Sequence, residues 1–175
     1  GAVVGAVTAL SGHPLLSIPA AMGAGVLSGL ITSLLQTKMG IDSLLAGIIV
    51  NTGLYSINIA IMGGSSLLNM NKTTTIFTMM KSLVSSTFLA QSYKLVTALI
   101  FVALVVLFLS FFLKTRLGLS LRATGDNPDM VKSSSINPAF TTIIGLCISS
   151  SFTALSGCLL AQSQKSVNVT IGSGM

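Results

Sequence analysis

Four long apolar stretches limit what this 175-residue chain can fold into more than any other feature. They cover residues 15–37, 44–62, 95–113 and 139–161. A helix needs roughly 20 mainly apolar residues to cross the hydrocarbon core of a bilayer. In the third stretch, 15 of the 19 residues are Leu, Ile, Val or Phe. The pattern therefore predicts four complete membrane-spanning helices.

Residues 1–10, GAVVGAVTAL, form a shorter apolar run. We expect them to be the tail of a partial fifth span, and we expect the ending VTIGSGM to continue into further chain. Residues 1–175 then form a single transmembrane domain that is a fragment of a longer protein.

The low content of charged residues supports a membrane protein. Only 7% of the residues are charged, and the mean hydropathy is +0.91. Soluble domains carry about 25% charged residues, enough to face water on all sides. The sequence thus predicts an all-α, polytopic helix bundle in the cytoplasmic membrane. Its net charge of +6 is interpreted as marking topology and lipid headgroup contact, and no nucleic-acid partner is expected.

Half of the charged residues are concentrated in one polar segment between the third and fourth apolar stretches. Residues 114–137 carry six of the twelve charged residues. Cytoplasmic loops are enriched in Lys and Arg, so we place this segment and Lys38 on the cytoplasmic side. Residues 63–91 and the tail after Gln162 then face outside.

The outer loop contains an amphipathic pattern over residues 75–87. Its apolar positions, spaced as on one face of a helix, are Ile76, Met79, Met80, Leu83 and Val84. We expect a helix on the outer membrane surface. It either packs against the bundle or docks an external partner.

Small residues recur every four positions in two of the predicted spans. One row is Ala21, Gly25, Gly29 and Ser33; the other is Gly145, Ser149, Thr153, Gly157 and Ala161. Small side chains let helix backbones approach closely in lipid. Both rows are therefore interpreted as helix-packing surfaces.

The second complete span carries polar residues along one face. Gly47, Asn51, Tyr55, Asn58 and Met62 recur near helical spacing. Two Asn and a Tyr are costly against lipid, so this face must look into the bundle. Asn51, Tyr55 and Asn58 either bond to neighbouring helices or line a translocation path for a small polar solute.

Several kinds of chemistry lack the residues that they need. No Asp, Glu, Lys, Arg or His lies in the middle of a predicted span, and no G-x-x-x-x-G-K-[ST] phosphate loop occurs. No catalytic residues and no metal site are predicted, because neither an activated nucleophile nor a ligand cluster can be found. We therefore expect a non-enzymatic protein without a cofactor of its own.

Two helix starts are encoded in the polar segment. Asn127-Pro128-Asp129 supplies an N-cap, a proline at the first helical position and an acid in the first turn. Asn137-Pro138 repeats the pattern of an N-cap followed by proline at the start of the last span. Gly125 is expected to turn the chain sharply with a positive φ. The segment is either a structured loop that marks topology or a docking helix for a cytosolic motor.

The stretch LRATGDNPDMVKSSSIN resembles the cytoplasmic coupling loop of bacterial ABC-importer permeases of the branched-chain amino acid and ribose permease class. The class pattern is close to L-R-A-x-G-x-N-P, a short helix, and G-I-N before the next span. Residues 37–64, TKMGIDSLLAGIIVNTGLYSINIAIMGG, look like a subgroup linked to uptake of amino acids, aromatic ones included, or unidentified solutes. Ser135 departs from this pattern because it stands where the family usually has Gly. The break after the short helix is thus expected to form differently here.

The resemblance implies a permease subunit that pairs with a second copy, binds cytosolic ATPase subunits and receives solute from an extracytoplasmic binding protein. ATP would be held by the partner subunits alone. The coupling loop would cover residues 114–138. The residues assigned to ATPase coupling are Arg122, Ala123, Gly125, Asp126, Asn127, Pro128, Met130 and Asn137.

Two other functions remain open from the residues. The alternative is a secondary transporter or channel whose coupling residues lie in other parts of the protein. A membrane scaffold without transport activity is a third interpretation. The identity of the solute cannot be read from the sequence, although a neutral hydrogen-bonding path suits an amino acid, a sugar or a nucleoside.

Overall fold

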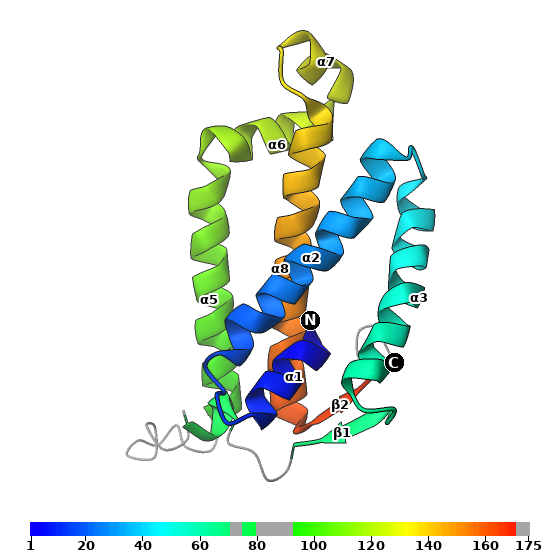
Figure 1. Cartoon of the computed structure of the whole chain (residues 1–175). Helices are drawn as coiled ribbons and strands as arrows, with labels where there is room; N and C mark the ends of the chain where they lie inside the picture. The colour runs from blue at the N-terminus through cyan, green and yellow to red at the C-terminus, as the bar shows by residue number, and fades with distance from the viewer. Residues whose placement is uncertain (71–74, 80–92, 171–175) are drawn as a thin grey trace.

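The computed structural model describes residues 1–70, 75–79 and 93–170. Its long helices are α2 (Ser17–Lys38), α3 (Ser43–Ile61), α5 (Tyr93–Leu113) and α8 (Pro138–Gln164). The shorter elements are α1 (Ala2–Leu10), β1 (Leu67–Asn69), α6 (Arg116–Asp126), α7 (Pro128–Ser133) and β2 (Ser166–Asn168). Figure 1 shows α6 running across from the end of α5 to α8, with α7 projecting beyond them.

The predicted all-α membrane bundle is confirmed. Four helices, α2, α3, α5 and α8, are long and apolar enough to cross a bilayer. They occupy the four stretches that the hydropathy pattern indicates. The helix α1 forms from residues 1–10 and packs against α2 and α8. Of the expected outer helix over residues 75–87, residues 76–79 are helical, Thr75 precedes the helix, and residues 80–87 lie outside the described residues.

The tightest packing joins α2 to α8, and it depends on the row of small residues in α2. Ala21, Gly25, Gly29 and Ser33 are all buried, as predicted. A Cβ on Gly25 would lie 2.6 Å from both the Ala154 Cβ and the Ser150 carbonyl oxygen. Only glycine therefore allows the two backbones to come this close, which is how helices associate where lipid removes the hydrophobic driving force.

The predicted small-residue row of α8 packs against different neighbours along its length, and only part of it is covered. Each four-residue step rotates the row by about 40° at 3.6 residues per turn, so successive members meet different neighbours. Gly145 faces Leu121 of α6, whereas Gly157 faces Ala2 of α1. Ser149 and Thr153 are exposed. The surface that meets α2 lies one residue further on, at Leu146, Ser150 and Ala154.

A small two-stranded sheet closes the end of the bundle opposite α7 (Figure 1). Strand β1 pairs antiparallel with β2, with Leu68 opposite Val167. Beneath it lies a buried apolar cluster to which α1, α8 and both strand regions contribute, with Met70, Ala161 and Val167 fully buried. The strands are too short to show the alternation that predicts β structure, so they were not expected.

One buried polar side chain ties three segments together at this end. Gln162 is 1% exposed. Its amide donates to the Ser17 hydroxyl at 2.7 Å and accepts from the Ile76 backbone N–H at 3.0 Å. Thr75 caps the short helix over residues 76–79, because its hydroxyl oxygen lies 3.4 Å from the Thr78 backbone nitrogen and accepts its N–H. Ile76 and Phe77 are buried, so the described start of the outer helix packs against the bundle.

A glycine pair in α2 tests the close approach of α2 and α8. In the full-length protein, Gly25→Ala should lower the thermal unfolding midpoint, because overpacking costs about 1–3 kcal/mol. Gly23→Ala is the matched control. A Cβ at position 23 would meet nothing within 4 Å. Because alanine has a higher helix propensity than glycine, Gly23→Ala should stabilise the protein by up to about 1 kcal/mol. Equal shifts of the thermal unfolding midpoint in both variants would contradict the close packing of α2 against α8.

Candidate functional site

A cavity of about 530 Å³ lies between α3, α2, α1 and α8. Its volume is within the ~300–1,000 Å³ range of small-molecule sites. Asn51 is the ninth of the 19 residues of α3, and Ser150 is the thirteenth of the 27 residues of α8. The cavity therefore reaches the middle of both spans, and it extends to Asn58 near the end of α3 and to Thr170 beyond the end of α8.

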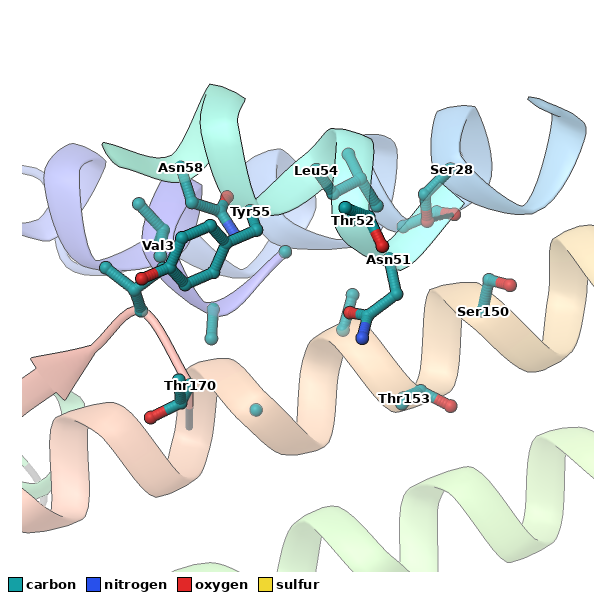
Figure 2. Close-up of a pocket in the computed structure, with 16 residues that line it drawn as sticks. Val3, Ser28, Asn51, Thr52, Leu54, Tyr55, Asn58, Ser150, Thr153 and Thr170 are labelled. Carbon is teal, nitrogen blue, oxygen red and sulfur yellow. Dashed lines mark hydrogen bonds between the residues drawn. The ribbon is translucent and has the colours of Figure 1, made fainter. Parts of the chain in front are cut away.

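The three residues proposed from sequence as a translocation path, Asn51, Tyr55 and Asn58, all line this cavity. Figure 2 shows Asn51 extending from α3 towards α8, where Ser150 and Thr153 lie. The Tyr55 ring extends instead towards Val3 of α1. One face of α3 thus presents two amides and a phenol to a single space.

Within the described chain, the side chains of Asn51, Tyr55 and Asn58 make no hydrogen bond to another helix. The alternative of interhelical bonding by these groups is therefore not seen in the described residues. Tyr55 is 46% exposed, and it lines the cavity. The free amide and phenol groups are available to a polar solute.

Hydroxyl groups that the sequence analysis did not assign to the translocation path complete the wall. Ser28, Thr52, Ser150, Thr153 and Thr170 also line the cavity. The Ser28, Thr52 and Thr153 hydroxyls donate to carbonyls of their own helices at 2.8–2.9 Å. Such back-bonding leaves each oxygen able to accept a further bond. Spacing could not identify these residues, because Ser and Thr also occur as ordinary packing residues.

The cavity is electrically neutral at its described side chains, since none of them is charged. Nor do three or more His, Cys, Asp or Glu come together among the described residues to hold a metal ion. The wall offers hydrogen-bond donors, acceptors and one aromatic ring. This set can bind and release a polar molecule, and it supplies no group for a covalent step.

A second candidate region is the elbow formed by α6 and α7, residues 116–133. Two contacts fix α6 to α8: Leu121 packs over Gly145, and the Thr124 and Thr141 hydroxyls are 3.0 Å apart. Near the start of α6, Gly118 packs on the last turn of α5, at Phe112 and Leu113. The elbow is thus connected rigidly to two membrane spans.

The two predicted helix starts in the elbow are confirmed. The Asn127 side chain accepts from the Asp129 and Met130 N–H groups at 3.1 and 3.2 Å. At the start of α8, the Asn137 side chain accepts from the Ala139 N–H at 3.0 Å. Each cap is followed by proline at the first helical position, which explains why the chain changes direction at these two points.

The expected turn at Gly125 is wrong. Gly125 lies inside α6, which continues to Asp126, and it has no positive φ. The chain turns at Asn127 instead, with φ −155° and ψ 100°. The residue before a proline is disfavoured in the helical region, so Pro128 ends α6 and the same Asn127 caps α7.

The expectation for Ser135 is also wrong. Ser135 adopts φ 60°, so the break after α7 has the left-handed backbone that glycine favours, although the residue is serine. The Ser135 and Ile136 N–H groups bond back to the carbonyls of Lys132 and Val131 at 3.3 Å. These bonds close α7 and hold the serine in this conformation.

All eight residues assigned to ATPase coupling are exposed. They are Arg122, Ala123, Gly125, Asp126, Asn127, Pro128, Met130 and Asn137. Met130 is 68% exposed, whereas its neighbour Val131 is 4% exposed. The helix α7 therefore turns one apolar residue inward as an anchor and leaves another free on its surface.

Comparison with known proteins gives a consistent result. The family model described as "Branched-chain amino acid transport system / permease component" matches residues 1–175. A "Tyrosine transport system permease protein" of Clostridioides difficile (strain R20291) is 38% identical over 161 residues, which is 92% of this chain and 50% of that protein. "Uncharacterized protein RP368" of Rickettsia prowazekii (strain Madrid E) is 34% identical over 152 residues, 87% of this chain and 51% of that protein.

The chain thus spans about half the length of these two relatives. No solved structure was found to match it.

Ser135→Gly tests the strained backbone of the elbow. A left-handed conformation costs an L-residue about 1–2 kcal/mol, so glycine should slow hydrogen exchange of the α7 amides in the full-length protein. Ser134→Gly is the control. Ser134 has φ −89°, and glycine there should leave exchange unchanged or speed it, because it adds only backbone entropy to the unfolded segment. Slower exchange in both variants would contradict the assignment of strain to Ser135.

Proposed function

Because the chain belongs to the family of branched-chain amino acid transport system permease components, we propose that it forms the membrane-spanning part of an ATP-driven importer for a small polar solute. The solute class that fits best is an amino acid. The observation that carries this proposal is the cavity with Asn51, Tyr55 and Asn58 on one wall, whose side chains make no hydrogen bond to another helix within the described residues.

The cavity serves as the transit site for the solute. Its neutral donors and acceptors replace the water that a polar molecule loses inside the membrane, without binding it so strongly that release becomes slow. A fixed charge at this depth would be costly, and the described wall has none. The described wall contains no Asp, Glu, Lys, Arg or His side chain, which favours an energy source outside the path.

An amino acid is favoured by two features. The relative from Clostridioides difficile carries the printed name of a tyrosine transport permease, at 38% identity. The cavity combines hydrogen-bonding groups with the ring of Tyr55, and aromatic rings pack well against other rings at offset or edge-on geometries. An aromatic amino acid would use both kinds of contact.

The elbow serves as the contact with the ATPase. ATP would be hydrolysed by two partner subunits in the cytosol. The helix α7 would contact them through Met130 and the exposed residues around Asn127. Closure of the ATPase pair would push α7. Since α6 is fixed to both α5 and α8, the push would tilt these spans and switch the access of the cavity from outside to inside.

The complete importer includes further partners. A second copy of the permease would supply the other side of the path, and an extracytoplasmic binding protein would deliver the solute. The family assignment supports these partners. The described chain contributes the cavity wall and the elbow.

Charge reversal on α6 tests the ATPase contact. With full-length protein and its ATPase in vesicles, Arg122→Glu should reduce ATP-driven uptake at least tenfold while membrane insertion stays intact, because like charges across an interface cost several kcal/mol. Arg116→Glu is the matched control. It makes the same charge change on the exposed first turn of the same helix and should retain uptake. Normal uptake by Arg122→Glu, or uptake without any ATPase, would contradict the proposal.

Removal of the amides tests the cavity. The double variant Asn51→Leu/Asn58→Leu should lose most uptake of the solute while ATPase assembly is preserved, because two hydrogen-bonding groups are replaced by apolar ones. Ser56→Leu is the control, since Ser56 is exposed on α3 but lies outside the cavity lining. Uptake of radiolabelled amino acids, aromatic and aliphatic, is the measurement. Wild-type uptake by the double variant would overturn the transit role.

A further inference from the structure

A second cavity, of about 420 Å³, forms a groove between α5 and α8 on the side away from α2. Most of its lining is apolar. The lining side chains are Phe77, Lys94, Ala98, Phe101, Val102, Val105, Val106, Phe152, Leu155, Ser156, Leu159, Leu160 and Ser163. The groove shares none of its lining residues with the first cavity.

The groove stays open because the facing side chains are large. On the α2 side of α8, Ser150 and Ala154 allow close backbone approach. On the α5 side, α8 presents Phe152, Leu155 and Leu159, which hold the two helices apart. Two contacts bound the space. The Phe108 and Phe152 rings meet edge to face with centroids 5.9 Å apart, and the Lys94 Nζ donates to the Ser163 carbonyl at 3.2 Å.

We propose that this groove binds one membrane phospholipid with an anionic headgroup, its acyl chain between α5 and α8 and its phosphate at Lys94. The proposal concerns lipid binding and does not depend on the transported solute or on the ATPase.

The dimensions of the groove match one leaflet. Along α5 its lining runs from Lys94 to Val106, which is about 18 Å at 1.5 Å per residue. Half of the hydrocarbon core of a bilayer is about 15 Å deep. Lys94 lies at the end of α5 opposite the elbow, and therefore at the outer membrane surface in the orientation derived above. A lipid of the outer leaflet would enter with its headgroup at the lysine.

The charge at the mouth selects the headgroup. Lys94 is the one charged side chain among the described lining residues. Its ammonium has three donors, of which the Ser163 carbonyl takes one, and the contact is exposed. The remaining N–H groups can bind phosphate oxygens through charge-assisted hydrogen bonds. An anionic headgroup is preferred over a zwitterionic one because it keeps a net negative charge.

A helix from another part of the protein is the competing occupant, and the lining disfavours it. Membrane helices associate through small residues that bring their backbones together. Along the groove, only Ala98, Ser156 and Ser163 are small, and they alternate with Phe, Leu and Val. A flexible acyl chain fits such an irregular surface better than a second helix does.

Photoactivatable lipids test the proposal. The full-length protein, in nanodiscs, is exposed to phosphatidylglycerol or phosphatidylcholine carrying a diazirine in the acyl chain, and crosslinked residues are mapped by mass spectrometry. We expect labelling at groove residues such as Phe101 and Val105, with phosphatidylglycerol favoured about fivefold, as one lysine near a phosphate predicts. Labelling at Leu104, an exposed α5 residue outside the groove, should show no preference.

Three variants separate the contributions of charge and shape. Lys94→Gln should abolish the headgroup preference at the groove, whereas Lys165→Gln, which removes a charge on the same side outside the groove, should retain it. Ser156→Phe should fill the groove and reduce labelling by both lipids. Equal labelling by both lipids in the wild type, or a preference that survives Lys94→Gln, would overturn the anionic site. Labelling at Leu104 but none in the groove would show that protein covers it.

Discussion

The close contact of α2 with α8 is the interaction on which the rest of the structure depends. Gly25 and Gly29 let the backbone of α2 approach the Ser150 and Leu146 carbonyls of α8 so closely that a Cβ would not fit. This contact fixes α8, the longest helix described. Each candidate surface then takes its position from α8: the first cavity on one side, the apolar groove along α5 on another, and the elbow at its start.

Rigidity at the two ends of α8 has different origins. At the elbow, neutral contacts and caps hold α6 and α7, while the Lys132–Asp129 ion pair at 3.1 Å is exposed and contributes little. At the opposite end, the buried Gln162 amide joins α2, α8 and the start of the outer helix. In the proposed importer, a push on the elbow would be transmitted through α8 to this polar junction at its far end.

Much of this architecture could be predicted from the sequence, because long apolar runs and proline-bearing caps are local signals. The spans, the Asn127 and Asn137 caps and the polar face of α3 are examples. The failures have two origins: tertiary context for the small-residue row of α8, and local chain geometry for the two turns that flank α7. The row from Gly145 to Ala161 rotates past several neighbours, the turn belongs to Asn127 rather than Gly125, and Ser135 is held at positive φ by the hydrogen bonds that close α7. Ser28, Ser150 and Thr170 join the cavity only when the helices are assembled.

The central claim is that the elbow lies in the cytosol, where a separate ATPase contacts it. The most direct measurement is labelling of Ser134→Cys by a membrane-impermeant maleimide, in a full-length variant whose native cysteines are replaced, with Ser66→Cys as the opposite-face control. The account predicts that Cys at position 134 reacts only from the cytoplasmic face and is protected when the ATPase is bound, while Cys at position 66 reacts only from outside. Reaction of position 134 from the outside medium would contradict the account.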